Sequence, residues 1–356
     1  MFLWTSQTTT RRHPAALFVP AFFAGFAVIA WSGIGTAAEA ETPVQDTPAV
    51  GDESPPSNSG KKPSEPGVVE VDEEAAERAL ERTLVAGGAL LLPFGQAEFE
   101  PAFNYTRRDN DVPVAVIEAA GIGATGDEAF LGSRNVKRNE FTPSADLRIG
   151  LPFDAQFEIG LPYNIVQQEI QPSDDEDTGH AIGDLRVGIA KTLVREKGWV
   201  PDVIARVIYD SNTGDKDDNG VALDGGFNDV SGQVVALKRQ DPLAFVASTS
   251  YEYTFEDDDI RPGDELNFTL GALLAASPET TLRAQLQQSF INDVKVNGRV
   301  INGSDQTQGV MILGASSILG RGVLLDVATG IGLTDDAPDY FVTVSLPIRF
   351  DLPIPQ

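Results

Sequence analysis

Residues 339–350 alternate between apolar and polar side chains at every second position. The apolar positions are Tyr340, Val342, Val344, Leu346, Ile348 and Phe350. The positions between them include Thr343, Ser345 and Arg349. A period of two residues predicts a β-strand with one apolar and one polar face. The same period recurs in residues 139–150, 155–169, 181–195, 242–255 and 280–292, whereas residues 229–239 and 308–319 alternate poorly.

This pattern predicts about twelve strands that follow one another along the chain. We place them at residues 98–107, 139–150, 155–169, 181–195, 200–210, 229–239, 242–255, 264–276, 280–292, 308–319, 322–333 and 339–350. An even number of antiparallel strands leaves both ends of a bacterial barrel in the periplasm. Each predicted strand is long enough to cross a bilayer at a tilt, which takes about 9 to 11 residues.

The connections between the predicted strands alternate between tight turns and long acidic loops. Tight turns fall near residues 151–154, 196–198, 239–242, 277–279 and 319–322. Acidic loops fall near residues 173–177, 210–228, 256–259, 292–305 and 334–339. Residues 108–138 form a long first loop, and we leave residues 113–120 in it because a further wall strand would make the number odd. Short periplasmic turns and long outer loops are typical of outer-membrane barrels.

A soluble antiparallel protein shows the same alternation, with its apolar face inward. Two features favour a membrane barrel. Aromatic residues gather at strand ends, as in interfacial girdles: Tyr105, Tyr163, Tyr209, Tyr251, Tyr253, Phe255, Tyr340 and Phe350. Opposite charges share the polar face in mid-strand, and we pair Asp146 with Arg148, Asp184 with Arg186, and Asp202 with Arg206. The predicted fold is all-β, an antiparallel transmembrane β-barrel of about twelve strands with a disordered or short-helical N-terminal extension.

The chain before the first predicted strand has three parts. Residues 1–40 combine two arginines, an apolar run and an A-x-A site, which predicts a secretory signal peptide. Residues 41–84 are predicted to be a periplasmic Pro- and Glu-rich linker that ends in a short helix over residues 71–84. Residues 85–356 form the predicted barrel. Its apolar lead-in, residues 85–94, is placed to plug or line the periplasmic mouth.

Composition narrows the functional classes. The formal net charge of −27 argues against a nucleic-acid partner, because an acidic surface repels phosphate. The chain has no cysteine, which excludes disulfides and thiol chemistry. Its hydrophobic content of 42% is compatible with a barrel, since only alternate strand residues face lipid.

Segments spread over residues 79–350 carry a family resemblance. They are residues 79–84, 88–93, 98–101, 105–108, 183–185 and 188–191, together with Leu147-Arg148-Ile149-Gly150-Leu151-Pro152 and Glu158-Ile159-Gly160-Leu161-Pro162-Tyr163. Together they resemble the outer-membrane family described as "putative MetA-pathway of phenol degradation". The resemblance implies a Gram-negative outer-membrane barrel that moves small molecules, aromatic ones included, and it carries over no catalytic residue. The barrel assembly machinery reads a final aromatic residue in such barrels; here residues 351–356 follow Phe350, which departs from that pattern.

Two motifs raise the question of other chemistry. Residues 215–220 match the start of a calcium loop, but Gly226 stands where the bidentate acid is required. A solvated loop that faces lipopolysaccharide is the alternative. His180, the only histidine beyond the predicted signal peptide, has no nucleophile or orienting acid placed beside it. We therefore expect neither an enzyme nor a cofactor.

The polar strand faces supply the candidate site in the barrel lumen. The candidates for solute selectivity are Arg148, Arg186, Arg206, Arg283, Arg349, Asp146, Glu158, Asp184, Asp202, Glu252 and Asp326, with Glu98 and Glu100 on the same face. Rings of charge set selectivity in pores. The same groups could instead pair and stiffen a barrel whose strand number lies between filled eight-stranded barrels and open porins.

The sequence thus predicts an outer-membrane barrel that acts as a passive channel or transporter for a small solute, aromatic or hydrophobic. The alternative is a non-conducting barrel whose acidic loops bind a partner or stabilise the lipopolysaccharide layer. The expected partners are the lipid bilayer, lipopolysaccharide, the barrel assembly machinery and, for a channel, the solute.

Overall fold

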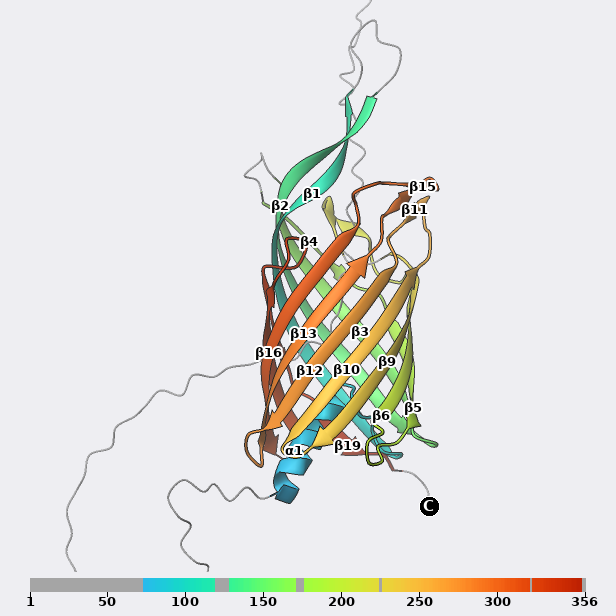
Figure 1. The fold of residues 1–356 in the computed structure, drawn as a ribbon. Helices are drawn as coiled ribbons and strands as arrows, with labels where there is room; N and C mark the ends of the chain where they lie inside the picture. Colours follow the sequence, from blue (N-terminus) through green and yellow to red (C-terminus); the bar gives the residue numbers. More distant parts are fainter. Residues whose placement is uncertain (1–72, 119–127, 171–175, 224–225, 321, 354–356) are drawn as a thin grey trace, which may run out of the picture.

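The computed structural model describes residues 73–118, 128–170, 176–223, 226–320 and 322–353. They form a closed antiparallel β-barrel of twelve wall strands (Figure 1). The predicted signal peptide, residues 1–40, and the predicted linker up to residue 72 lie outside the described residues. The wall consists of β1 (Gln96–Glu118), β2 (Glu128–Leu151), β3 (Ala155–Ile170), β4 (Glu176–Ile182) with β5 (Arg186–Val194), β6 (Asp202–Asp210), β9 (Asp229–Gln240), β10 (Leu243–Thr254), β12 (Glu265–Ala275), β13 (Thr280–Ile291), β16 (Gln306–Gly320), β17 (Val323–Gly332), and β18 (Tyr340–Ser345) with β19 (Ile348–Asp351).

The last wall strand closes the barrel against the first. β1 pairs with β18 from Ala102 to Arg107 and with β19 from Gln96 to Phe99. β4 and β5 count as one wall strand because both pair with β3 and only three residues separate them. The predicted strand number is therefore confirmed.

The apolar face of the strands points outward, whereas in a soluble sandwich the apolar face points inward. Leu270 on β12 is 63% exposed, whereas Leu237 on the inner face of β9 is fully buried. Phe103, Leu161 and Val344 are also exposed on the outside of the wall. An exposed apolar band of this extent marks a surface that a membrane covers.

The first hairpin corrects the sequence prediction. Residues 108–138 were expected to form a loop, but β1 and β2 remain paired up to Glu118 and Glu128. Beyond Arg107 and Val136 neither strand has a wall neighbour, so the hairpin projects above the barrel (Figure 1). The prediction failed because it counted only wall strands, whereas a run of β-branched residues continues β1 past the rim.

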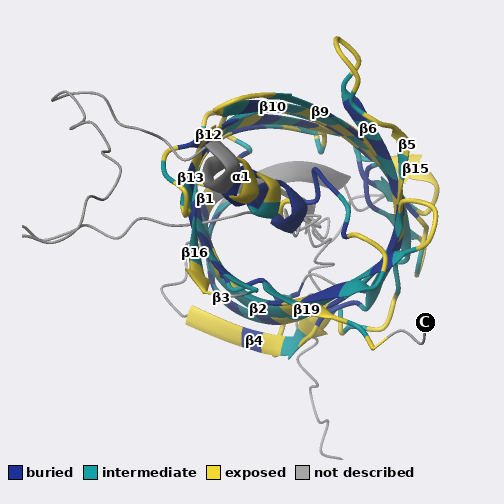
Figure 2. Cartoon of the chain, turned by 90° about the horizontal axis from the view of Figure 1, so that it is seen from below, coloured by how far each residue is buried: buried dark blue, intermediate teal, exposed yellow. Residues whose placement is uncertain are grey.

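The helix α1 (Glu73–Ala86) lies inside the ring of wall strands (Figure 2). It begins and ends two residues later than the predicted helix. The helix packs against the wall strands β12, β13 and β16. Its residues Leu80, Leu84 and Val85 are almost completely buried. Among the described residues, no helix is long and apolar enough to cross a membrane.

The long loops, at the end of the barrel opposite the short turns, contain five short strands among the described residues. They are β7 (Asp217–Asp218), β8 (Val221–Ala222), β11 (Ile260–Arg261), β14 (Lys295–Val296) and β15 (Arg299–Val300). β7 and β8 form a hairpin whose two turn residues, Asn219 and Gly220, have φ values of 53° and 80°. Those angles define a tight turn that favours Asn-Gly. The segment that resembled a calcium loop is thus a β-hairpin.

Candidate functional site: the barrel lumen

The N-terminal segment forms a floor across the short-turn end of the lumen. We define this floor as residues 79–93. α1 packs beside β12, β13 and β16. The chain after it reaches β3, where the backbone amide of Leu92 donates to Gln156 Oε1 over 2.8 Å. Gly150 of β2 lies so close that a β-carbon there would sit 2.1 Å from the Pro93 carbonyl oxygen.

Arg148 of β2 holds the C-terminal end of α1. Its Nη1 atom donates to the carbonyl oxygens of Ala86 and Val85, at 2.8 and 3.3 Å. These carbonyls have no partner within the helix, and the helix dipole favours a cation at this end. The arginines of α1 itself lie earlier in the helix. The wall therefore supplies the cation that the end of the helix lacks.

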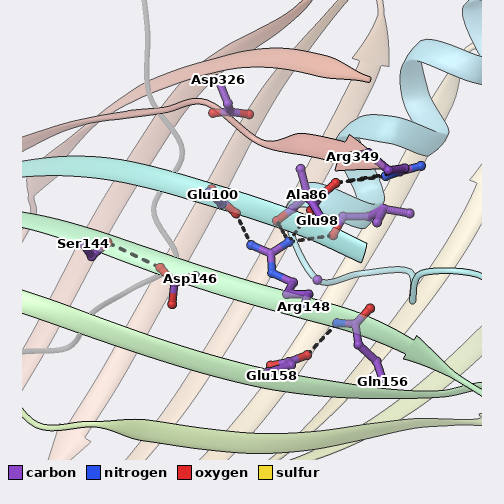
Figure 3. A network of polar contacts seen from close by, with 12 residues as sticks. Ala86, Glu98, Glu100, Ser144, Asp146, Arg148, Gln156, Glu158, Asp326 and Arg349 are labelled. Atoms are coloured by element: carbon purple, nitrogen blue, oxygen red, sulfur yellow. Dashed lines mark hydrogen bonds and ion pairs between the residues drawn. The ribbon is translucent and has the colours of Figure 1, made fainter. Parts of the chain in front are cut away.

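The same guanidinium group also neutralises two buried carboxylates (Figure 3). Arg148 pairs with Glu98 at 3.0 Å and with Glu100, and Arg349 pairs with Glu98 at 3.2 Å. Glu98, Glu100 and Arg148 are each 5% exposed or less. Buried ions are tolerated only when they are paired and hydrogen-bonded, so this cluster of wall residues is a fixed support beneath the floor's contact with Arg148.

Two further contacts fasten the floor to the wall. Arg206 of β6 donates to the Gly88 carbonyl oxygen at 3.2 Å and pairs with Glu158 at 3.1 Å. The hydroxyl groups of Thr83 and Ser316 share a hydrogen bond of 2.9 Å beside a buried apolar cluster that contains Leu80 and Leu84.

A cavity of about 390 Å³ occupies the lumen above the floor. It extends from Gly87 and Ala89 up to Arg108 and Thr254 near the long-loop end. Eight carboxylates and four guanidinium groups contribute to its wall, together with many hydroxyl and amide groups. The cavity wall is therefore acidic, and apolar side chains such as Ile159, Ile208 and Phe227 form part of it.

Comparison with known proteins gives this barrel a family. Residues 108–350 match the model of the family described as "Putative MetA-pathway of phenol degradation", which is more than half of the chain. The chain belongs to this family. An outer membrane channel from Pseudomonas putida F1 shares the fold, with a TM-score of 0.58, 14% identity, and coverage of 74% of this chain and 98% of that one.

Other solved barrels are less similar. The translocator domain of the autotransporter NalP from Neisseria meningitidis has a TM-score of 0.46 at 14% identity, covering 80% of this chain and 100% of that one. The transport unit of the autotransporter AIDA-I from Escherichia coli has a TM-score of 0.39 at 10% identity, covering 79% and 99%. As a member of the matched family, this chain is a barrel of the Gram-negative outer membrane. The short turns of such barrels lie at the periplasmic end.

The charged pairs of this family member differ from those predicted within single strands. Arg148 pairs with Glu98 and Glu100, and the carboxylate nearest to Arg186 is Asp146, at 3.8 Å. Because residues two apart on a strand point the same way, we paired them with each other. The structure instead joins charges across neighbouring strands, where side chains directly face one another.

Asp184 and Asp202 serve local structure at opposite ends of the barrel. Asp184 accepts hydrogen bonds from the backbone amides of Thr213, Gly214 and Gly226, at 2.6, 2.6 and 3.0 Å, and so anchors both ends of the β6–β9 loop. Asp202 lies at the periplasmic start of β6, 3.3 Å from Arg239. The predicted pairs of Asp184 with Arg186 and of Asp202 with Arg206 are therefore wrong.

The remaining predicted lumen residues lie at different heights. Arg283 and Asp326 form a buried pair at 3.2 Å beside α1, whereas Glu252 lines the cavity. Asp146, Glu158, Asp184, Arg186 and Arg206 also contribute to the cavity wall. Asp202, Arg283, Asp326 and Arg349 are not among the residues that line it.

The sequence reasoning missed several inward-facing polar residues. They are Arg108, Arg138, Glu140, Asp210, Asp229 and Glu265. Asp210 and Asp229 are end residues of the predicted strands 200–210 and 229–239, and each continues the inward face of its strand. If the alternation of inward and outward side chains had been followed to the last paired residue of each strand, it would have identified these two residues.

The β6–β9 loop also folds into the outer end of the lumen. Val221 and Leu223 pack on Val166 of the inner face of β3, and the Ala222 carbonyl accepts a hydrogen bond from Arg138 Nη1 over 2.7 Å. His180 lies beside this loop, 3.0 Å from the Tyr163 hydroxyl. In the parts of the chain that the structure describes, no cluster of three or more metal-ligating side chains occurs.

Proposed function

We propose that this outer-membrane barrel provides a passive route for a small solute. The observation that carries the proposal is the acidic cavity, which reaches from the outer end of the lumen down to the floor. Its hydroxyl, amide and carboxylate groups can replace the water shell of a polar solute as it enters. Apolar side chains such as Ile159, Ile208 and Phe227 share the wall with these groups, so the lining is also compatible with the aromatic or hydrophobic solute that the family resemblance implies.

The floor sets the expected rate of passage. It crosses the lumen between opposite sides of the wall and is held by hydrogen bonds from Arg148, Arg206 and Gln156. A solute that leaves the cavity toward the periplasm must pass this segment. We therefore expect a small conductance that is limited by the floor, in contrast to the wide water-filled lumen of a porin.

Planar bilayer recordings test the proposal directly. The purified full-length protein should give small single-channel currents and, in a potassium chloride gradient, a reversal potential that shows cation preference. The preference follows from the eight carboxylates and four guanidinium groups of the cavity wall. The absence of both conductance and solute flux into liposomes would contradict the proposal.

A variant of Arg186 sharpens the test. Arg186→Ala removes a positive charge from the cavity wall and should increase cation preference. Arg195→Ala is a matched control, because Arg195 lies in an exposed pair with Asp154 at the periplasmic rim, away from the cavity. Equal reversal potentials for the two variants would argue against selectivity by the lumen.

The second candidate function is a non-conducting barrel that stabilises the membrane or binds a partner through its loops. The buried ion pairs of the wall favour it, since Arg283 and Asp326 have side chains 1% and 0% exposed. Under this hypothesis Arg186→Ala changes thermal stability and leaves flux at the background level of empty liposomes.

A further inference from the structure

The connection between β5 and β6, residues 195–201, leaves the wall on the outside of the barrel. We call it the β5–β6 turn. Two backbone hydrogen bonds of 3.1 Å between Lys197 and Val200 close its tip. A β-bulge between Thr192 and Val194 interrupts the register of β5 with β6 just before the turn. Bulges bend a strand and redirect the chain that follows. Figure 2 shows the exposed tip of the turn outside the ring of strands, beside β6 and β9.

Side chains of β9 hold this turn against the outer face of the wall. Lys238 Nζ donates to the Gly198 carbonyl oxygen over 2.6 Å and pairs with Glu196. Arg239 pairs with the same carboxylate at 3.1 Å. Lys238 points outward, because its neighbour Leu237 is fully buried on the inner face and side chains alternate along a strand. The turn is therefore a fixed projection on the lipid side of the barrel.

The tip of the turn presents an uncovered aromatic side chain. Trp199 is 96% exposed, and Lys197 beside it is exposed as well. Tryptophan is enriched where a membrane meets water, because its ring is apolar and its N–H group is polar. The β5–β6 turn is one of the short turns, so the surface that this side chain meets is the periplasmic leaflet of the outer membrane.

A groove of about 360 Å³ lies on the outer face of the wall next to the turn. The residues that line it include Pro201, Ala236, Lys238, Phe245, Ala247 and Leu270. The small alanines leave space beside the larger side chains of Phe245 and Leu270, and Lys238 is the only charged residue of the lining. Ordered water needs two to four polar partners, which this lining does not supply. A hydrocarbon chain needs none.

The groove runs from the periplasmic rim toward the membrane core. Its charged end is Lys238, which is in register with Phe245 and lies two residues before the end of β9. Its apolar end is the pair of Ala247 and Leu270, which are in register two residues farther along β10, about 7 Å away. A phospholipid of the periplasmic leaflet places its phosphate at the rim and its acyl chains toward the core. The order of charged and apolar groups in the groove matches this arrangement.

We propose that the groove and the β5–β6 turn together bind one phospholipid of the periplasmic leaflet. An acyl chain occupies the groove, Lys238 donates to a phosphate oxygen, and Trp199 lies at the level of the headgroups. Lys238 has a donor for the phosphate, because an ammonium group carries three N–H bonds and Glu196 and Gly198 accept two of them. The long acidic loops face lipopolysaccharide at the opposite end of the barrel, so this site takes a lipid of the other leaflet.

Native mass spectrometry of the full-length protein in detergent, titrated with dioleoyl phosphatidylglycerol, tests this site. One lipid should remain bound per barrel. Dioleoylglycerol, which has the same chains but no phosphate, should bind about tenfold more weakly, because the charge-assisted hydrogen bond is lost. Ala247→Leu should weaken binding of the phospholipid about tenfold by filling the groove. Ala145→Leu, the same change at an exposed position of β2, is the matched control and should bind as the wild type does. Equal binding by the two variants, or of the two lipids, would overturn the proposal.

Two variants separate the phosphate contact from the position of the turn. Lys238→Gln removes the ammonium group and should weaken phospholipid binding about tenfold. Glu196→Gln also loosens the attachment of the turn but keeps that ammonium group and removes a competing carboxylate. It should therefore bind the phospholipid at least as tightly as the wild type. Equal losses in the two variants would show that Lys238 holds only the turn, which contradicts the proposed site.

Fluorescence tests the position of Trp199, the only tryptophan among the described residues. The emission of the wild type minus that of Trp199→Phe isolates its signal in liposomes. Phospholipids brominated on the acyl chain close to the headgroup should quench this signal severalfold, whereas a water-exposed tryptophan would keep its full emission and so overturn the proposal. These assays need no conduction, so a barrel that retains the phospholipid but carries no current would refute the proposed function alone.

Discussion

In the periplasmic half of the lumen, Arg148, Arg283 and Arg349 each lie 3.0–3.2 Å from a buried carboxylate. In the outer half, Asp210 and Glu265 each keep a carboxylate oxygen that no described residue pairs. Both halves belong to the same strands and follow the same inward parity. The difference arises from the N-terminal segment, which brings the buried apolar face of α1 and the carbonyls at its C-terminal end into the periplasmic half only.

This difference assigns separate roles to charges that look alike in the sequence. In the periplasmic half, oppositely charged side chains neutralise each other and hold the floor in place, so their loss affects folding. In the outer half, charged side chains border the cavity, so their loss affects which solutes the cavity accepts. Changes in the two halves should therefore separate into effects on stability and effects on binding.

Arg148→Ala should have the largest effect. It leaves Glu98 and Glu100 buried beside each other and frees the carbonyls at the end of α1. Removal of one partner of a buried pair costs about 3–5 kcal/mol of unfolding free energy. Urea unfolding of the barrel in detergent, followed by the intrinsic fluorescence, measures the change. Arg195→Ala, in an exposed pair, should cost about 1 kcal/mol or less, and equal losses in the two variants would contradict the floor network.

Leu84→Ala tests the apolar side of the floor. Leu84 is 1% exposed within a cluster formed by α1 and the wall, so truncation should cost about 3 kcal/mol. A loosened helix should also increase single-channel conductance. Leu333→Ala, at an exposed site 57% accessible beyond β17, is the control and should change neither property. A stable Leu84→Ala barrel of unaltered conductance would mean that the helix does not restrict passage.

The strands could be predicted from the sequence because every wall strand must present apolar residues to lipid at alternate positions. Phe103, Leu161 and Val344 show this constraint plainly. The poorly alternating residues 229–239 also form a strand, β9, since their neighbours β6 and β10 leave no other partner for either edge. Alternation and turn order thus gave the number of strands and the two faces.

The partners inside the lumen could not be predicted in the same way. Parity places Arg148 and Asp146 on one face, but the register between strands decides which charges meet, and register depends on contacts distant in the sequence. The position of α1 was equally hidden. Its apolar residues Leu80 and Leu84 indicated only a thin stripe, and nothing local shows that this stripe packs inside the wall.

Gly88→Ala separates the Arg206 contact from backbone strain. Gly88 has a φ of +67°, and a β-carbon there would lie 2.6 Å from Arg206 Nη2, so the guanidinium group must shift. Gly198 has a φ of +58° with open space around it. Gly198→Ala therefore imposes the same strain, about 1 kcal/mol, without displacing any neighbour. We expect a lower melting temperature for both variants and a higher conductance only for Gly88→Ala. Equal conductance of the two variants would mean that the contact of Arg206 with Gly88 does not hold the floor in place.

The smallest expected effect concerns Glu196, in the periplasmic turn between β5 and β6. Burial raises the pKa of this carboxyl group, but hydrogen bonds from Lys238 and Arg239 outweigh burial and lower the pKa below its usual value. A carboxyl group with a lowered pKa stabilises the folded state above its unfolded pKa of about 4.3, and this contribution is lost as pH falls through the folded pKa. Melting temperatures of the wild type and Glu196→Gln should differ slightly at neutral pH and converge below about pH 4. Glu279→Gln, in the exposed turn between β12 and β13, is the control variant, and a Glu196→Gln difference that grows on acidification would contradict the assignment.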